Sequence, residues 1–275
     1  MLTPNSSQVY KHRMNVSRNV LITGASGGIG YELAKLFARD RHNLILVARS
    51  ADKLAQVAKE MEGMGVRVKT VPLDLAGSPA RKFLFDQMER EGVAVDILIN
   101  NAGFGAYGEF TAMSESEILG QISLNITALT ELTHLFLPPM IERRFGRIMN
   151  VASTAGFQPG PLMAVYYATK AYVISFSEAI ANELQNSGVT VTCLCPGATE
   201  TGFAKRAGND KTRIFKRAGV MPADKVALDG YRAVMEGRTL AISGAQNWLV
   251  AQSTRFAPRK LVTAISRWVS ETGES

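Results

Sequence analysis

The sequence has few of the residues that build metal sites and disulfide frameworks. Among its 275 residues there are two cysteines and three histidines, His12, His42 and His134, which are scattered along the chain. Cys193 and Cys195 lie two apart in a predicted buried strand, too close for easy disulfide geometry and too few for a zinc site. We therefore expect no metal. The cysteines are interpreted as small core residues in a reducing cytoplasm.

Long apolar runs and linkers are also missing. The chain is 46% hydrophobic, yet no uninterrupted apolar run approaches the roughly 18 residues that would indicate a membrane span. No Pro/Ser-rich linker or repeat divides the chain, which favours one large α/β domain over residues 18–275. Residues 1–17 hold basic residues without a following apolar stretch, so we expect a disordered extension rather than a secretory signal. Met14 is a second candidate start.

The formal net charge of +7 raises the question of nucleic acid as a partner. The positive residues are dispersed along the chain, and no nucleic-acid motif accompanies them. A solvated basic surface is the better explanation, and we expect no nucleic-acid partner.

Apolar segments rich in β-branched residues alternate with helical patterns. This alternation predicts an α/β fold, a doubly wound Rossmann-type parallel sheet with helices on both faces. Ligands of such sheets bind in the crevice beyond the carboxyl ends of the strands. The predicted strands lie near residues 19–23, 43–48, 66–71, 95–99, 146–152, 189–195 and 239–243.

A glycine-rich turn follows the first predicted strand. Val20–Ile22 leads into Thr23–Gly30, and apolar Leu33, Leu36 and Phe37 follow at helical spacing. Glycines allow the backbone to approach a pyrophosphate, and the helix N-terminus supplies N–H donors and a positive dipole. The spacing Gly-x3-Gly-x-Gly differs from the general dinucleotide fingerprint Gly-x-Gly-x-x-Gly. A flexible loop is the alternative, but the flanking elements favour a dinucleotide site.

A second signal is the spacing of Tyr166 and Lys170. On a helix these positions share a face, so the lysine ammonium lies beside the phenol. A nearby cation favours the phenolate and lowers the tyrosine pKa toward working pH, which suits proton transfer. Tyr167 has no lysine four positions later and points elsewhere. By itself the pair would favour the alternative interpretation, a core tyrosine with a solvated lysine.

Several motifs in one order make the sequence similar to the short-chain dehydrogenase/reductase family, in its conventional single-domain branch. The resemblance covers about residues 18–245 and implies seven strands in the order 3-2-1-4-5-6-7. It also implies a homodimer or homotetramer built on helices around residues 115–144 and 164–187. The motifs are Thr23–Gly30, Asn100–Gly103, Asn125, Ser153, Tyr166 with Lys170, and Pro196–Gly197.

The resemblance assigns catalytic roles to four residues. Tyr166 would exchange a proton with the substrate oxygen, and Lys170 would lower the tyrosine pKa and hold the nicotinamide ribose. Ser153 would hydrogen-bond the carbonyl oxygen. Asn125 would anchor a water relay behind Lys170, although a tolerated polar helix residue is the alternative.

The end of the second predicted strand favours NADP(H) over NAD(H). Ala48 stands where an acid would bind the ribose 2′-hydroxyl, and Arg49 offers a guanidinium to a 2′-phosphate. By resemblance, Asp74 contacts the adenine and Asn101 to Gly103 line its ribose. Thr199 and Thr201 would contact the nicotinamide amide, although a helix-cap role is a nearly equal interpretation of either threonine. The expected cofactor-binding residues are Gly24, Ser26, Gly28, Ile29, Gly30, Arg49, Asp74, Leu75, Asn101, Ala102, Gly103, Tyr166, Lys170, Pro196, Gly197, Thr199 and Thr201.

The substrate pocket is expected to be apolar, which favours a lipophilic carbonyl or alcohol substrate. Its expected residues are Phe104, Tyr107, Phe157, Leu162, Met163 and Phe203. A mobile lid is expected at about residues 199–235, and its basic part, 205–217, would recruit an anionic 3-oxoacyl thioester by steering. A neutral ketone or aldehyde is at least as good an alternative. A non-catalytic NADPH-binding regulator is a further alternative, which the four retained catalytic residues disfavour.

Residues 253–270 form an amphipathic basic segment. Cationic residues alternate with apolar ones, as in a helix that lies at a membrane surface. The sequence favours a terminal helix that covers the core, or a subunit contact, over this membrane interpretation. The residues of the pattern are Arg255, Phe256, Arg259, Lys260, Leu261, Val262, Ile265, Arg267, Trp268 and Val269.

Overall fold

The computed structural model describes residues 17–216 and 219–272, with backbone alone at residue 216. The extension expected at residues 1–17 therefore lies almost wholly outside the described residues.

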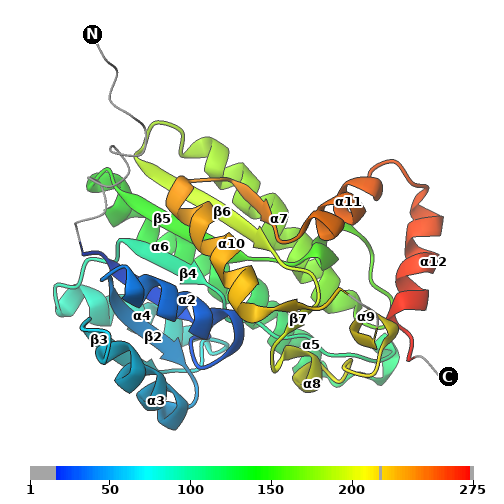
Figure 1. Cartoon of the computed structure of the whole chain (residues 1–275), viewed down its shortest axis with the longest axis horizontal. Coiled ribbons are helices and arrows are strands. Elements are labelled where there is room, and N and C mark those ends of the chain that lie inside the picture. Colours follow the sequence, from blue (N-terminus) through cyan, green and yellow to red (C-terminus); the bar gives the residue numbers. More distant parts are fainter. Residues whose placement is uncertain (1–16, 217–218, 273–275) are drawn as a thin grey trace.

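A seven-stranded parallel sheet forms the centre of the molecule (Figure 1). Its order is β3-β2-β1-β4-β5-β6-β9, with every neighbouring pair parallel. The predicted order is confirmed, with β9 as the seventh strand. The strands are β1 (Asn19–Thr23), β2 (Asn43–Ala48), β3 (Val68–Pro72), β4 (Ile97–Asn100), β5 (Gly146–Val151), β6 (Val189–Cys195) and β9 (Leu240–Ile242).

Helices cover both faces of this sheet because alternate strand residues point to opposite sides. Val20 and Ile22 of β1 pack in one core cluster, and Leu21 packs in another. The first cluster includes side chains of α2 (Gly28–Arg39), α3 (Ala51–Glu62) and α10 (Ala223–Glu236). The second includes side chains of α4 (Ser78–Arg90), α6 (Leu129–Glu142) and α7 (Ala164–Glu183).

The long helical stretch after β4 changes its winding near the middle. It begins as α5 (Glu115–Ile122), whose first turn has a capping box between Ser114 and Glu117. A π-helical turn at Ser123–Ala128 then leads into α6. Such turns are rare and are frequent at functional sites.

Short elements lie over the carboxyl ends of the strands. β7 (Thr199–Glu200) pairs with β8 (Met221–Pro222), and α8 (Phe203–Ala207) and α9 (Arg213–Lys216) lie between them in the sequence. Short 3-10 turns occur at Phe110–Ala112 and Thr154–Phe157.

The lid expected at about residues 199–235 does not include its last part. Its last part forms α10, whose buried Val226 and Val234 pack in the core against α2 and β6. A helix held in the core by its apolar face belongs to the sheet layers rather than to a cover, so we propose a lid for residues 199–222 alone.

The chain ends in two helices that stand beside the sheet rather than over it (Figure 1). They are α11 (Ala245–Ser253) and α12 (Arg259–Ser270), and we call residues 245–270 the C-terminal arm. The helix within the predicted amphipathic segment begins at Arg259 rather than near residue 255. Pro258 precedes it as the N-cap, and proline is poorly tolerated inside a helix. No helix among the described residues is long and apolar enough to cross a bilayer.

Candidate active site

A cavity of about 550 Å³ opens at the carboxyl ends of the strands. Its walls include the glycine turn after β1, the ends of β2 and β5, the segments after β4 and β6, and the face of α7. This is the crevice expected for a doubly wound sheet.

The glycine turn is held in a shape that side chains would disturb. Gly24 and Gly28 have φ angles of +66° and +55°, which glycine adopts without strain. A Cβ on Gly30 would lie 2.5 Å from the carbonyl oxygen of Gly24 and 2.6 Å from Nδ2 of Asn101. The backbone N–H groups at the start of α2 are thereby left open to an anionic ligand.

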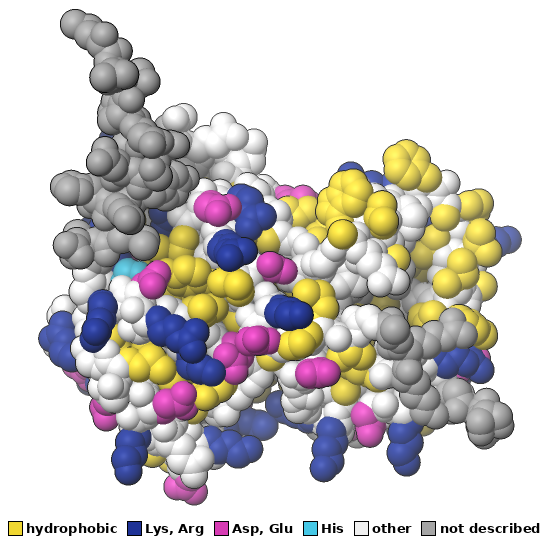
Figure 2. All heavy atoms as spheres, in the orientation of Figure 1, with side chains coloured by type: hydrophobic (Ala, Val, Ile, Leu, Met, Phe, Trp, Pro, Cys, Tyr) yellow, Lys and Arg dark blue, Asp and Glu magenta, His cyan; other side chains and the backbone are white. Residues whose placement is uncertain are grey.

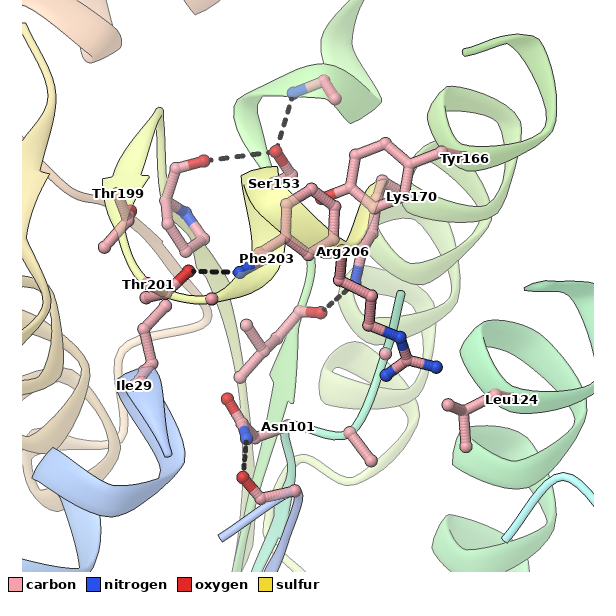
Figure 3. Close-up of a pocket in the computed structure, with 18 of the residues that line it drawn as sticks. Ile29, Asn101, Leu124, Ser153, Tyr166, Lys170, Thr199, Thr201, Phe203 and Arg206 are labelled. Atoms are coloured by element: carbon pink, nitrogen blue, oxygen red, sulfur yellow. Dashed lines mark hydrogen bonds between the residues drawn. The ribbon is translucent and has the colours of Figure 1, made fainter. Parts of the chain in front are cut away.

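Asn101 ties this turn to the end of β4. Its Nδ2 donates to the carbonyl oxygens of Thr23 and Gly24, at 2.8 and 3.2 Å. Thr23 Oγ1 in turn accepts from the backbone N–H groups of Asn101 and Ala102. The Asn101 side chain thus fixes the shape of the site from behind (Figure 3).

Tyr166, Ser153 and Lys170 lie together on one wall of the cavity (Figure 3). Ser153 is extended at the end of β5, and its Oγ accepts from the Ala155 N–H and donates to the Pro196 carbonyl oxygen at 3.3 Å. Lys170 Nζ donates to the Val151 carbonyl oxygen at 2.7 Å and lies 5.7 Å from the centre of the Tyr166 ring. The structure therefore brings together three of the four expected catalytic residues around one space.

Burial dominates the pKa values of this group. It raises the pKa of Tyr166, and hydrogen bonding with Ser153 lowers it again in part. Burial also lowers the pKa of Lys170 to about 8. The predicted lowering of the tyrosine pKa by Lys170 does not appear in the protein alone, where burial of the phenol is the largest cause and raises this pKa.

Asn125 lies in the π-helical turn, behind the cavity wall rather than in it. Its amide donates to the Phe104 carbonyl oxygen at 2.8 Å and to Thr169 Oγ1 at 3.1 Å, and it accepts from the Phe104 N–H. Asn125 thus connects the segment after β4 to α7. A Cβ on Gly103 would lie 3.1 Å from Asn125 Oδ1 and 3.5 Å from Lys170 Nζ, so these two side chains approach the same backbone.

The end of the cavity near β2 is lined by Arg49, Asp74 and Leu75. Asp74 Oδ1 accepts from the Ala76 N–H, which shapes the turn after β3. Arg206 of α8 also lines the cavity, and its guanidinium lies 4.7 Å from the centre of the Phe104 ring. Arg49 and burial lower the pKa of Arg206, burial being the larger cause, so the two cations face the same region.

The segment after β6 closes the other side. Pro196, Gly197, Thr199 and Thr201 all line the cavity. Thr199 Oγ1 donates to the Gly197 carbonyl oxygen at 2.9 Å, and Thr201 Oγ1 accepts from the Phe203 N–H at 3.2 Å. Thr201 thus accepts from the first N–H of α8, as the capping alternative requires, whereas the Thr199 hydroxyl bonds a carbonyl oxygen instead.

Residues 18–212 match the family model described as short chain dehydrogenase. The chain belongs to this family. It is 33% identical over 240 residues to the ketoacyl reductase HetN of a Nostoc species, covering 87% of this chain and 82% of that protein. It is an oxidoreductase of the kind that acts on carbonyl and alcohol groups.

Solved structures agree with the fold of this dehydrogenase. A short-chain dehydrogenase from Sphingobium yanoikuyae, in complex with NADPH, is 34% identical with a TM-score of 0.78, covering 87% of this chain and 94% of that one. A bulky-bulky ketone specific alcohol dehydrogenase from Comamonas testosteroni is 30% identical with a TM-score of 0.73, covering 87% and 92% of the two chains.

The structure divides the expected substrate residues of the dehydrogenase into two groups. Tyr107, Met163 and Phe203 line the cavity, whereas Phe104, Phe157 and Leu162 do not. Phe157 packs instead against the core beside α7 and β6. Phe104 lies under Arg206, and the Leu162 carbonyl oxygen accepts from the Gly108 N–H. Apolar loop residues can face either side of a loop, and the sequence carries no signal for the choice.

Several cavity residues escaped the sequence analysis. Tyr167 does not point away from the site but lines it too, with its ring over Gly160, where a Cβ would lie 2.1 Å from the ring. The basic composition of residues 205–217 indicated that Arg206 could bind a ligand, but it did not indicate that the Arg206 side chain faces the cavity. The other cavity residues that were missed include Leu124, Gln158, Asn209, Ile214, Phe215 and Ser270.

Proposed function

We propose that the protein is an NADP(H)-dependent oxidoreductase that interconverts a carbonyl and a secondary alcohol on a lipophilic small molecule. One observation carries the proposal: the Tyr166 phenol, the Ser153 hydroxyl and the Lys170 ammonium border the cavity that also holds the glycine turn. A redox-inactive NADPH-binding regulator would need the turn but would have no use for the other three groups.

The chain's own residues have separate roles in this reaction. Ser153 rotates its hydroxyl from the Pro196 carbonyl oxygen toward the substrate oxygen and orients the carbonyl. Tyr166 then gives its proton to the developing alkoxide, which suits a phenol that burial keeps protonated. Asn125 keeps the segment at Phe104 in place against α7 and, by family resemblance, anchors a water relay behind Lys170.

The nicotinamide coenzyme supplies or accepts the hydride when it is bound. Residues of the cavity fit this group: the turn from Gly24 to Gly28 would offer backbone N–H groups to the pyrophosphate, and Lys170, by family resemblance, would hold the nicotinamide ribose. Arg49 is exposed at the end of β2, beside small Ala48, which suits a 2′-phosphate. The NADPH complex of the relative from Sphingobium yanoikuyae supports this preference.

The substrate class rests on the apolar part of the cavity. Tyr107, Met163 and Phe203 form it together with Ile214 and Phe215. Apolar pockets with few polar groups favour lipophilic ligands. The relative from Comamonas testosteroni, described as specific for bulky-bulky ketones, supports the same class.

The direct test is an NADPH-oxidation screen over ketones, aldehydes, quinones and 3-oxoacyl thioesters. We expect at least one lipophilic carbonyl to be reduced, and Tyr166→Phe to lower kcat by about 100-fold or more while NADPH still binds. Tyr167→Phe is the matched control, because it changes the neighbouring ring of the same cavity and should keep most of the turnover. NADPH binding without reduction of any carbonyl would favour the regulator instead.

A 3-oxoacyl thioester is the second candidate substrate. Relatives described as ketoacyl reductases favour it, including HetN and a very-long-chain 3-oxoacyl-CoA reductase of Pyrenophora tritici-repentis, 32% identical over 260 residues. Exposed Lys205 and Lys211 of the proposed lid would steer the anionic carrier. We then expect kcat/KM for a thioester to fall steeply with salt, and less steeply in Lys205→Gln/Lys211→Gln. Unchanged salt dependence in that variant would exclude steering by these lysines.

The cytoplasm remains the proposed compartment. The low cysteine content supports this proposal, since Cys193 and Cys195 are both buried in β6.

A further inference from the structure

The last helix presents its apolar face to the outside. Val262, Ser266 and Ser270 of α12 are buried against the body of the protein. Leu261 and Ile265 lie on the outer side and are 52% and 54% exposed, and Trp268 continues this side one turn later. The usual orientation of an amphipathic helix on a globular protein is the reverse. The helix is therefore held by small side chains, and its larger apolar ones face outward.

The rest of the C-terminal arm extends this apolar surface. Leu249 of α11 is 61% exposed, Trp248 beside it is also exposed, and Phe256 in the turn between the helices is 87% exposed. Figure 2 shows hydrophobic side chains gathered over this part of the molecule, with Lys and Arg at its edges. Single exposed apolar residues are normal on a protein surface, whereas a continuous patch indicates a binding surface.

The charged residues within the C-terminal arm are all positive. The sequence from residue 237 to residue 270 contains no Asp or Glu. Arg267 pairs with Glu109 and Glu271, but no described acidic side chain pairs with Arg255, Arg259 or Lys260. A shallow groove on α12 is lined by Pro161, Arg259, Lys260, Thr263, Ala264 and Arg267. An anionic headgroup would find two cationic side chains without a described acidic partner along this groove, Arg259 and Lys260.

The charge disfavours a second copy of this chain as the occupant. A twofold contact would place the patch against itself. The unpaired cations of one copy would then face those of the other, and like charges oppose such a contact. A bilayer with anionic lipids matches both the apolar patch and its cations. Its acyl region accommodates aromatic and aliphatic side chains, and its headgroups attract Lys and Arg.

We propose that the C-terminal arm is a membrane-docking surface that lies on an anionic bilayer. Leu249, Phe256, Leu261 and Ile265 enter the headgroup boundary, and Arg255, Arg259 and Lys260 contact the lipid phosphates. The arm borders the cavity directly, because Ser270 lines it. If the proposed function holds, docking would bring the site to lipophilic substrates in the bilayer, but docking itself does not depend on that reaction.

Vesicle co-sedimentation of the full chain tests the proposal. The vesicles are phosphatidylcholine alone, or phosphatidylcholine with about 30% phosphatidylglycerol. We expect binding to the anionic vesicles, weaker binding to the neutral ones, and a decrease with salt. Leu261→Gln/Ile265→Gln should lower the binding constant by about tenfold or more. Thermal melting and circular dichroism check that the variants fold. Absence of wild-type binding to anionic vesicles at low ionic strength would overturn the proposal.

Matched controls distinguish docking by the C-terminal arm from nonspecific adsorption of the protein to vesicles. Phe256→Ser is compared with Phe83→Ser, since Phe83 is an exposed phenylalanine on α4. Arg259→Gln/Lys260→Gln is compared with Arg39→Gln/Lys59→Gln, two exposed cations on α2 and α3. Only the arm variants should lose binding. Equal losses of binding in the arm variants and in their controls would overturn the proposal. A particle mass in the absence of lipid that is lower for Leu261→Gln/Ile265→Gln than for the wild type would also overturn it, in favour of a second copy of the chain.

Discussion

Burial shifts the pKa values of individual residues of the site in the ligand-free protein. Tyr166 and Lys170 lie on one face of α7, as their spacing requires, but both are removed from water. Burial favours the uncharged form of each, so the phenol keeps its proton and the amine gives its proton up more easily. An anionic coenzyme close to Lys170 would favour the ammonium again.

We therefore predict that coenzyme binding depends on pH through Lys170. Its pKa is lowered to about 8 from 10.5, so between these values the folded protein holds the neutral amine while the unfolded chain holds the ammonium. Stability from this group rises with pH across that window, and the cost of burying the charge is fully present below pH 8. The affinity for NADP⁺ should show the opposite trend. It should fall as pH rises above about 8, because binding then requires the neutral Lys170 amine to take up a proton.

Fluorescence titration of NADPH and competition by NADP⁺ between about pH 7 and pH 10 measure this effect. Lys170→Met should bind more weakly and lose the pH dependence. The neighbouring ionisable groups are Tyr166 and the thiols Cys193 and Cys195, so Cys193→Ala/Cys195→Ala serves as the control that keeps the profile. A wild-type affinity that is constant over this range would contradict the assignment.

A second prediction at this scale concerns coenzyme choice. Arg49 lines the cavity at the end of β2, so NADPH should bind at least about tenfold tighter than NADH, or about 1.4 kcal/mol. Arg49→Ala should remove most of that difference without changing NADH affinity. Arg39→Ala, an exposed arginine at the end of α2, should leave both affinities unchanged. Equal wild-type affinities for the two coenzymes would exclude the role of Arg49.

At the scale of elements, the glycine turn separates positions that must be glycine from positions that need not be. A Cβ on Gly30 would meet a backbone oxygen and an amide nitrogen, at 2.5 and 2.6 Å. Gly27 is extended, and no described heavy atom lies within 4 Å of its Cβ position.

Gly30→Ala is accordingly predicted to lower the free energy of unfolding by about 1–3 kcal/mol, because β1 and α2 must move apart at the turn. It should also weaken NADPH binding. Gly27→Ala should leave the unfolding free energy nearly unchanged. Denaturant unfolding and coenzyme titration of both variants check this, and equal effects would show that packing at residue 30 does not shape the turn.

At the scale of the whole molecule, exposed apolar side chains occur in two regions. One is the C-terminal arm. The other lies on α5, α6 and α7, where Leu119, Ile122, Ile141 and Tyr172 are exposed and Tyr172 stacks on Phe176 at 5.7 Å. Family resemblance places subunit contacts on these long helices, so we propose that this surface forms a homo-oligomer.

Light scattering should then give a mass at least twice the chain's 29.8 kDa. Tyr172→Arg should lower it, because a twofold contact would bring two added cations together. Phe256→Ser in the C-terminal arm is the control and should leave the mass unchanged. A monomeric wild-type protein would contradict the proposal.

The sequence alone determined the strands of the sheet and indicated the residues of the candidate site. Strand positions, strand order, the turn from Gly24 to Gly30 and the pairing of Tyr166 with Lys170 depend on short-range spacing and on a family pattern. The strands, the turn and the Tyr166–Lys170 pair are encoded within a few residues or within one βα unit, whereas the strand order came from the family resemblance. They could be predicted without knowing what packs against them.

Only the tertiary structure decided which way several side chains and one helix face. Phe157 turns to the core, Tyr167 faces the cavity, Arg206 reaches toward the region of Arg49, and α10 packs in the core rather than in a lid. Each outcome depends on a neighbour far away in the sequence, and an apolar or amphipathic pattern fits either side of a loop or helix equally well. The outward apolar face of α12 is the clearest case, because small side chains at residues 266 and 270 let the opposite face approach the body.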